Sequence, residues 1–200
     1  MSGAGFGAAW ATPAGRLTVV AAGPADVAVH APALAAAYND PHNARLLGHT
    51  AVLTEADVVE HYATLRAGNG HAFLLFVDGA LAGDGDLRDV TAEAAEFAFL
   101  IAAPAAQGQG LGTRFALMIH GLAFAPPPRG LGLARVYAAV VPGNVASRRV
   151  FEKLGYVVDV SEPAAAFGDP GDVILRLERA ELVRRHGEAL AAIALAPVPA

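Results

Sequence analysis

The sequence predicts a single α/β domain, of the mixed α+β kind, in which helices flank a mixed β-sheet. Two hundred residues are enough for one domain with a substantial core. The chain is 54% hydrophobic and 16% charged, which argues against disorder, because disorder needs low hydrophobicity and high net charge. Segments of β-branched or aromatic character are interspersed with segments of helical spacing. This pattern predicts a sheet and helices in one domain.

The composition limits the classes of function. The formal net charge is -5 and no basic block offsets it, so the sequence argues against a nucleic-acid partner. The chain has no cysteine, which excludes disulfides, zinc thiolate sites and a cysteine nucleophile. Its seven histidines form no HxxxH or HxH pair, and we therefore expect no metal site.

The sequence also predicts no membrane association. No apolar stretch approaches the roughly 20 residues that a transmembrane helix needs. The first residues, MSGAGFGAAWATPAGR, lack the charged region and the long apolar run of a secretory signal peptide. We therefore expect a cytoplasmic protein.

The first quarter of the chain predicts one strand and one helical stretch. Residues 1–15 are rich in glycine and alanine, and we expect a loose segment there. Residues 16–22, RLTVVAA, have the β-branched content of a strand. A helical stretch begins at Pro24, and Pro32 is expected to kink or divide it. Residues 39–43, NDPHN, have the composition of a loop.

A capped helix and a hairpin follow. Thr54 with Asp57 three residues later predicts a helix start, and this helix runs to about Leu65. Residues 71–78 predict a strand. The dipeptide DG at 78–79 predicts a hairpin, because a type I′ turn needs positive φ at both central positions.

The second half predicts more strands and helices. Strands are expected at 96–102, 135–141, 156–160 and 172–178, and helices at 111–124, 145–154 and 178–195. The helix at 111–124 carries a core stripe of Leu111, Phe115, Met118 and Leu122. His120 is offset from this stripe, and we expect it on the surface or in a groove. The expected organisation is a loose segment at 1–15, a domain at 16–180, and a C-terminal helix and tail at 181–200.

Three glycines at alternate positions, Gly108, Gly110 and Gly112, stand between a strand and a helix. This arrangement presents backbone N–H groups to an anion at a helix N-terminus. A phosphate-binding P-loop needs a lysine that is missing here, and the spacing also fails the G-x-G-x-x-G dinucleotide pattern. The spacing that does fit is Gln or Arg, two residues, Gly, one residue, and Gly or Ala, which Gln107, Gly110 and Gly112 match.

This loop resembles motif A of the GNAT superfamily of N-acetyltransferases, where the loop cradles the pyrophosphate of acetyl-coenzyme A. The resemblance continues at 144–156, NVASRRVFEKLGY, which is similar to a late helix of the family. It covers residues 71–156 and leans towards the branch that includes ribosomal-protein N-terminal acetyltransferases. It implies a GNAT-like, mostly antiparallel central sheet. It also implies direct acetyl transfer from acetyl-CoA to the amine of a small molecule or a protein N-terminus.

The resemblance also implies which residues bind the cofactor. They are Leu100, Ile101 and Ala102 of the strand, Gln107, Gly108, Gln109, Gly110, Leu111, Gly112 and Thr113 of the loop and helix start, and Asn144, Ser147 and Phe151 of the late helix.

Several of these residues have alternative roles. Asn144 can also cap the late helix, and Ser147 can be purely structural. Three basic side chains of this helix meet either the cofactor's phosphates or solvent, and they are Arg148, Arg149 and Lys153. Many family members carry a tyrosine that protonates the leaving thiolate at the position of Phe151. The proton donor is therefore left open between water, Ser147, another tyrosine and an unassisted departure.

A carboxylate base is expected, because an amine is largely protonated at neutral pH and must lose a proton before it attacks. Glu96 is the first candidate, since it begins the strand before the glycine loop and shares a face with Ala98 and Leu100. Glu93 is the second. Asp84 and Asp86 are alternative partners for the substrate ammonium, and any one of these carboxylates can instead be a solvated surface group.

Two other functions remain open from the sequence alone. The loop would serve an enzyme that transfers a longer acyl group equally well. A non-catalytic, CoA-binding sensory or structural domain is the other alternative, and Phe151 is its main support. Specificity for the acceptor would come from the early helices and the loops around 39–52 and 86–95. The oligomeric state is open, a homodimer included.

Overall fold

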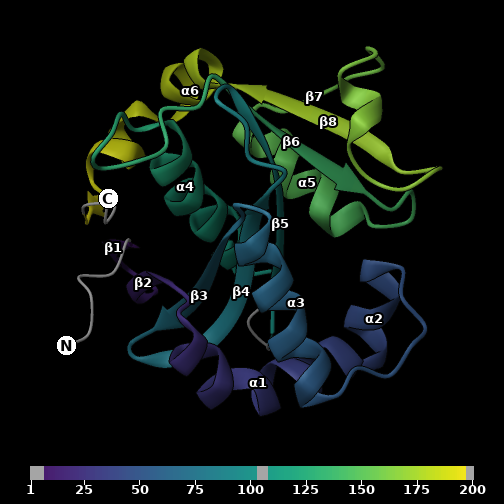
Figure 1. Ribbon diagram of the computed structural model, residues 1–200. Coiled ribbons are helices and arrows are strands. Elements are labelled where there is room, and N and C mark those ends of the chain that lie inside the picture. The colour runs from purple at the N-terminus through teal and green to yellow at the C-terminus, as the bar shows by residue number, and fades with distance from the viewer. Residues whose placement is uncertain (1–6, 103–107, 197–200) are drawn as a thin grey trace.

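The computed structural model of the chain describes residues 7–102 and 108–196. Within them, nine strands form one sheet in the order β7-β8-β6-β5-β4-β3-β2-β1-β9 (Figure 1). The strands are β1 (Gly7–Thr12), β2 (Gly15–Ala21), β3 (His71–Val77), β4 (Ala80–Arg88), β5 (Ala94–Ile101), β6 (Arg135–Val140), β7 (Val157–Val158), β8 (Val173–Glu178) and β9 (Ala194–Leu195). The helices are α1 (Pro24–Asn39), α2 (Pro41–Leu47), α3 (Glu55–Ala67), α4 (Leu111–Phe124), α5 (Val145–Leu154), α6 (Arg179–Ala191) and the 3-10 helix η2 (Ala164–Ala166).

The strand pairing is antiparallel except at one place, where β5 runs parallel to β6. The β3–β4 hairpin turns at Asp78 and Gly79, and both φ angles are positive, at 48° and 83°. Positive φ at both positions is what the predicted turn requires. The prediction of one mixed, mostly antiparallel sheet flanked by helices is confirmed.

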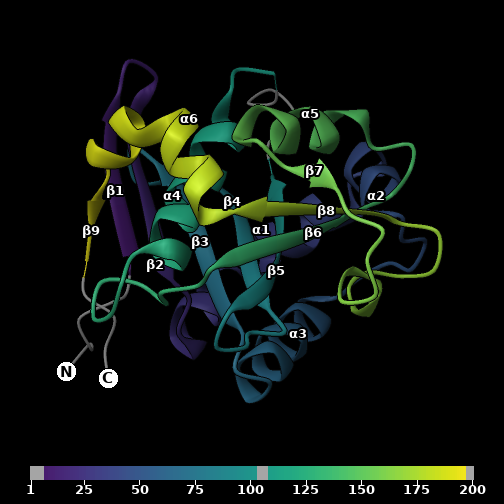
Figure 2. The same ribbon diagram turned by 90° about the horizontal axis from the view of Figure 1, so that it is seen from above.

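Helices cover both faces of the sheet (Figure 2). On one face, α1 and α3 pack against each other, α1 contacts β4 and α3 contacts β3. The opposite face carries α4, which also contacts α5 and α6. The larger core lies under α4 and includes Phe97 of β5 and Phe115 of α4, both almost fully buried. Because strand side chains alternate, Glu96, Ala98 and Leu100 of β5 point to the face of α1 and α3.

The register between β4 and β5 shows which β4 side chains lie on the face of α1 and α3. Asp84 pairs with Leu100, Asp86 with Ala98, and Arg88 with Glu96. Directly opposed residues of an antiparallel pair point to the same side of the sheet. The polar side chains of β4 therefore lie under α1 and α3, beside one face of β5.

The expectation of a loose segment over 1–15 is wrong for residues 7–12, which form β1. This strand pairs with β2 on one side and with β9 on the other. Its ladder therefore has partners on both edges, and Ala8 is only 4% exposed. The C-terminal helix is shorter than expected, because it ends at Ala191 and the chain then adds β9 to the sheet.

Two further local expectations need correction. Residues 41–47 form helix α2 instead of a loop, and Asp40 caps it by accepting hydrogen bonds from the N–H groups of His42 and Asn43. His120 is fully buried and not on the surface. Burial is tolerated there because its ring nitrogens have partners, Ala116 O at 2.6 Å and Tyr156 Oη at 2.5 Å. Pro32 lies inside α1, which is one helix throughout.

Candidate active site

The glycine loop leads into α4 through left-handed backbone. Gly108 and Gly110 have φ angles of 78° and 76°, and Gly110 is the N-cap residue of the helix. Residues with a Cβ adopt such angles at a cost, so glycine suits both positions. The first N–H groups of α4 have no partner within the helix, and the helix dipole adds partial positive charge at this end. Gln107, the first residue of the predicted pattern, lies outside the described residues.

A cavity of about 330 Å³ opens at this helix start, and we call it the glycine-loop cavity. The structure brings many of the predicted cofactor residues together in its wall, namely Leu100, Ile101, Gly108, Gly110, Gly112, Thr113, Asn144 and Ser147. Others lie beside it. Ala102 follows β5 and donates its N–H to Ala82 O, and Gln109 is exposed. Leu111 and Phe151 are buried in the core.

The sheet opens next to this cavity. The parallel ladder between β5 and β6 ends at the pair Glu96–Tyr137 in the described residues, although β5 continues to Ile101 and β6 to Val140. The two strands therefore diverge towards the glycine loop. A wedge between diverging strands gives an extended ligand room to lie alongside the β5 backbone.

Helix α2, which the sequence did not predict, helps to wall the cavity. Asn144 caps α5 by accepting the Ser147 N–H at 2.9 Å, and its Nδ2 donates to Leu46 O at 2.9 Å. The fully buried Asn43 donates to Ala37 O at 2.9 Å and to Ala102 O at 3.4 Å. These bonds fix α2 between α5 and the end of β5. The Asn144 side chain thus caps α5, as one of its two predicted roles requires.

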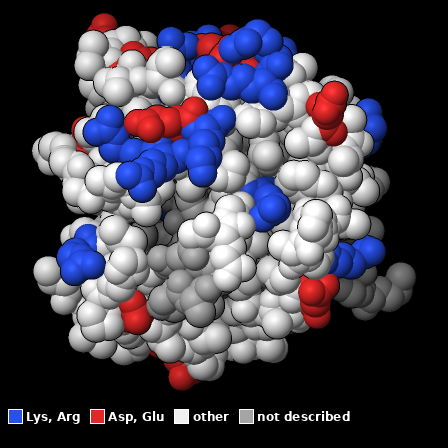
Figure 3. Space-filling model, turned by 180° about the vertical axis from the view of Figure 1, so that it is seen from behind, with Lys and Arg blue, Asp and Glu red and all other residues white. Residues whose placement is uncertain are grey.

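Basic side chains gather on the upper half of the face that Figure 3 shows from behind. Two basic side chains of α5, Arg149 and Lys153, line the glycine-loop cavity. Arg148 instead pairs with Glu152, with 3.9 Å between the charged atoms, one turn along the helix. The rim of the cavity therefore offers two cations to an anionic ligand, in addition to the N-terminus of α4.

A second cavity, of about 280 Å³, lies on the face of α1 and α3, and we call it the tyrosine cavity. Tyr38 of α1 and Tyr62 of α3 line it together with Asp86 and Arg88 of β4. Leu47, Phe99 and Leu100 line both cavities. The two cavities therefore meet near the C-terminal end of β5, at Phe99 and Leu100.

Two buried carboxylates of β4 lie at the tyrosine cavity, Asp86 in its wall and Asp84 behind it. Asp86 holds Arg88 in a two-pronged ion pair, with Oδ1–Nε at 2.7 Å and Oδ2–NH2 at 2.8 Å. Asp84 Oδ2 accepts hydrogen bonds from the hydroxyls of Tyr38 and Tyr62 at 2.6 and 2.5 Å. Burial raises the pKa of Asp84 to about 6, although the two phenols act in the opposite direction.

Glu96, the first predicted base, lies at the point where β5 and β6 diverge. It is 7% exposed, and its Oε2 accepts a weak hydrogen bond of 3.4 Å from Gly168 N. Burial raises its pKa, while the nearby Arg88 acts to lower it. Leu100 lies four positions after Glu96, which is about 13 Å along a strand. Glu96 is not among the described residues that line either cavity.

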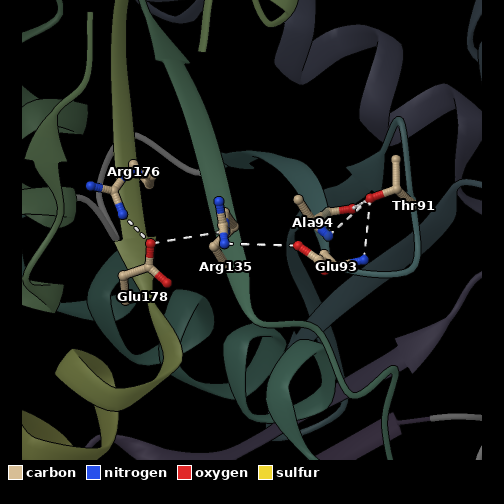
Figure 4. A network of polar contacts seen from close by, with 6 residues as sticks. All are labelled: Thr91, Glu93, Ala94, Arg135, Arg176 and Glu178. Carbon is tan, nitrogen blue, oxygen red and sulfur yellow. Dashed lines mark hydrogen bonds and ion pairs between the residues drawn. The ribbon is translucent and has the colours of Figure 1, made fainter. Parts of the chain in front are cut away.

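Glu93, the second predicted base, lies before β5 at the surface. Its carboxylate is 3.8 Å from Arg135, which in turn is 3.9 Å from Glu178 (Figure 4). The preceding turn is fixed by Thr91, whose Oγ1 accepts the N–H groups of Glu93 and Ala94. The structure thus places Glu93 in a surface ion-pair network and does not bring it to Leu100.

Sequence reasoning named Asp84 and Asp86 but missed the two tyrosines and Arg88. Tyr38 and Tyr62 come from different helices, and only the packing of α1 against α3 brings their hydroxyls to one carboxylate. No local motif carries that information. Arg88 offered one signal, since it stands two residues after Asp86 and so shares its strand face.

Among residues 7–102 and 108–196, no group of three or more histidine, aspartate or glutamate side chains is placed to hold a metal ion. No helix in the same residues is long and apolar enough to cross a bilayer.

Solved structures with the same fold include acetyltransferases. The aminoglycoside acetyltransferase AAC(6')-Ib in complex with coenzyme A is 20% identical, with a TM-score of 0.67 over 84% of this chain and 98% of that one. RimJ of Mycobacterium smegmatis, in complex with CoA-disulfide, is 19% identical, with a TM-score of 0.68 over 94% of this chain and 93% of that one. An acetyltransferase of Agrobacterium tumefaciens is 22% identical, with a TM-score of 0.64 over 82% and 91%. No curated protein sequence matches the chain.

The sequence itself matches a family model over most of its length. The model describes an acetyltransferase (GNAT) domain and covers residues 16–157, which include the glycine loop and the late helix. The resemblance seen in these two segments is confirmed, and the chain belongs to the GNAT acetyltransferase family.

Proposed function

We propose that the protein is an acetyl-CoA-dependent N-acetyltransferase that moves an acetyl group directly to the amine of a small molecule or a protein N-terminus. The observation that carries this proposal is the meeting of two cavities at Leu100. One cavity has a helix N-terminus and two cations, which suit a phosphorylated cofactor. The other has buried carboxylates, which suit an amine.

The residues of the glycine-loop cavity fit coenzyme A. The N–H groups at Gly108–Thr113 would bind the pyrophosphate, and Arg149 and Lys153 at the rim would neutralise phosphate charge. The wedge between β5 and β6 would take the pantetheine arm, with the β5 backbone at Leu100 and Ile101 beside it. Structures of AAC(6')-Ib and RimJ with coenzyme A or its disulfide support this use of the fold.

Direct transfer needs two proton removals from the acceptor nitrogen. An ammonium loses one proton before it can attack and a second when the new C–N bond has formed. The C–S bond then breaks, and the thiolate leaves with the electron pair. Glu96 is proposed to accept the second proton, through a water molecule. Its burial supports this role, because the raised pKa makes the carboxylate a better base. Glu93 stays the alternative for the same proton.

The proton donor to the thiolate is proposed to be water. Phe151 has no proton to give, and its ring packs against Phe97, Phe99 and Tyr156 in the core. Tyr156 is an unsuitable substitute, since it is buried and bonded to His120. Ser147 lines the cavity and stays the side-chain alternative to water. The cytoplasmic location predicted from the sequence remains part of this proposal.

The proposal is tested by following thiol release from acetyl-CoA with the full-length protein. The acceptors are a panel of primary alkylamines, an aminoglycoside and short peptides with free N-termini. We expect saturable thiol release with at least one amine and an acetylated product of matching mass. Binding of acetyl-CoA without transfer to any member of the panel would instead support the non-catalytic alternative. Transfer from a longer acyl-CoA in preference to acetyl-CoA would show that the protein is an acyltransferase for that longer group.

A further inference from the structure

The cluster of Tyr38, Tyr62 and Asp84 has a polar atom without a partner. Both phenols donate to one carboxylate oxygen, Oδ2. The other oxygen, Oδ1, is buried and has no hydrogen-bond partner among the described residues. Asp84 as a whole is 3% exposed. A buried carboxylate without its full set of hydrogen bonds is costly, which favours a functional explanation over a purely structural one.

The cluster also stands at the place where the two cavities meet. In the sheet register, Asp84 is directly opposite Leu100, the residue that both cavities share. Opposed Cβ atoms in an antiparallel pair are about 5 Å apart. Asp86 is two residues farther from this junction and Glu96 is four. Of these three carboxylates, Asp84 therefore lies nearest in register to the end of the glycine-loop cavity.

The phenols separate this carboxylate from the cavity. Tyr38 and Tyr62 line the tyrosine cavity, whereas Asp84 lies behind them. A phenol oxygen that donates its hydrogen can still accept one from a ligand. Burial raises the pKa of both phenols, so each keeps its proton and remains a donor to Asp84. An ammonium group in the cavity would thus meet two phenol oxygens with a negative charge behind them.

We propose that Tyr38, Tyr62 and Asp84 bind the ammonium of the acceptor and take from it the first proton, the one that must leave before attack. The proton moves from nitrogen to one phenol oxygen while that phenol's own proton passes to Asp84. The products are a neutral amine, an intact phenol and a carboxylic acid, which later returns its proton to solvent. This inference rests on the proposed amine acetylation, and it leaves the second proton to Glu96.

The surroundings of the cluster indicate which acceptors fit. The charged groups nearest Asp84 are Asp86 and Arg88 of β4, and the phenols face it from α1 and α3. Two carboxylates and one guanidinium make this group of three side chains net negative at neutral pH. Arg88 is already held by Asp86 and is not free for a substrate carboxylate. The rest of the wall combines apolar side chains, such as Leu53 and Val58, with Asp57, His49 and His61. The structure therefore favours a primary alkylammonium on an apolar body over an amine that carries an anionic group.

The test compares two amines that differ mainly in the pKa of the nitrogen. They are 2-phenylethylamine and its 2,2-difluoro derivative, whose fluorines lower the pKa of the ammonium. In Asp84→Asn the amide oxygen can still accept both phenol hydrogens, but it cannot take up a proton. We expect kcat/KM at pH 7 to fall roughly 100-fold or more with 2-phenylethylamine and less than about threefold with the difluoro compound. The loss with 2-phenylethylamine should shrink as the pH rises and the free amine becomes abundant.

Control variants separate this role from a structural one. The double variant Tyr38→Phe/Tyr62→Phe removes the bridging hydroxyls and should reproduce the selective loss. Asp86→Asn removes a neighbouring negative charge but leaves the phenols in place, so both amines should be affected by the same factor. Acetyl-CoA affinity and circular dichroism, measured for each variant, show whether the fold is kept.

Each other outcome overturns the inference. An equal loss with both amines in Asp84→Asn would make Asp84 structural, while the proposed acetyl transfer would stand. If the wild type acetylates other amines but neither of these two, the acceptor is not a primary alkylammonium on an apolar body. Absence of transfer to every amine by the wild type would remove the proposed function together with this inference.

Discussion

Tyr156 donates a buried hydrogen bond of 2.5 Å to Nε2 of His120. The other ring nitrogen, Nδ1, lies 2.6 Å from Ala116 O, and since a carbonyl can only accept, Nδ1 carries the proton. Burial lowers the pKa of His120 to about 4, so the ring is neutral at pH 7, with Nδ1 donating and Nε2 accepting. In the core beneath α4, the ring of His120 packs against Phe97 and the ring of Tyr156 packs against Phe151. This pair links α4 to the segment just after α5, and both helices line the glycine-loop cavity.

Removing the donor of this bond should destabilise the protein. In Tyr156→Phe the Nε2 atom stays buried and loses its partner, which costs about 1–3 kcal/mol. We expect that decrease in the free energy of unfolding by urea at pH 7. A decrease below about 0.5 kcal/mol would mean that water or a rotated ring replaces the phenol.

His120 and Asp84 should give opposite pH dependences of stability. Burial lowers the pKa of His120 to about 4, so stability falls as the pH drops from 6.5 towards 4, when only the unfolded chain takes up the proton. Burial raises the pKa of Asp84 to about 6, so stability falls as the pH rises from 4 to 6, when the unfolded carboxyl ionises first. Each effect is on the order of 3 kcal/mol.

The two effects should therefore largely cancel in the wild type between pH 4 and 6. Relative to the wild type, Asp84→Asn should gain stability as the pH rises over this range, and His120→Gln should lose it. Urea unfolding at pH 4, 5 and 6 measures both differences, and ionisations common to all three proteins drop out of the comparison. Parallel curves for a variant and the wild type would show that the pKa of that residue is close to its unfolded value.

Local signals in the sequence predicted what depends on neighbours along the chain. Thr54 and Asp57 predicted the start of α3, and the structure has their reciprocal hydrogen bonds. The Asp78–Gly79 turn and the glycine loop were predicted for the same reason, because one backbone conformation requires those residues. The family resemblance added the mostly antiparallel arrangement of the sheet and the residues expected to bind the cofactor.

The rest depends on contacts between distant segments. Residues 7–12 are poor in strong strand formers, but they form β1 because β2 and β9 pair with both of their edges. The surface position predicted for His120 was wrong, because its burial depends on a hydrogen bond with Tyr156, 36 residues away. The same holds for the acceptor side of the site, where Tyr38 and Asp84 come from an early helix and a later strand.

The glycine loop can be tested with a matched pair of substitutions. Gly108→Ala and Gly79→Ala both place a Cβ at positive φ, 78° and 83°, and both new Cβ atoms meet no atom within 4 Å. We expect each to cost about 1 kcal/mol of stability. Only Gly108→Ala should weaken acetyl-CoA binding, by about tenfold, because its methyl group occupies space that the phosphates need. Calorimetric titration with equal affinities for the two variants would remove the loop from the cofactor site.

The two predicted bases can be separated by the same chemical change. Glu96→Gln keeps the shape of the side chain but cannot accept a proton, and kcat should fall roughly 10²–10⁴-fold. Glu93→Gln breaks only an exposed ion pair, and its kcat should stay within about twofold of the wild type. A large loss of kcat in Glu93→Gln with a small one in Glu96→Gln would make Glu93 the base and Glu96 a structural residue. The raised pKa of Glu96 predicts that the acid limb of the wild-type kcat profile lies above the ordinary glutamate range.

Phe151→Tyr tests whether a missing phenol limits turnover. The Phe151 side chain is 2% exposed and touches the rings of Phe97, Phe99 and Tyr156. A hydroxyl added there enters an apolar cluster, and we expect it to lower stability by about 1–3 kcal/mol. We expect kcat to stay within about threefold of the wild type, because the thiolate of coenzyme A is a good leaving group that water can protonate. Steady-state kinetics at a temperature where both proteins are folded gives the comparison. A tenfold gain in kcat would show that the new phenol reaches the leaving sulfur and that its protonation limits the wild-type rate.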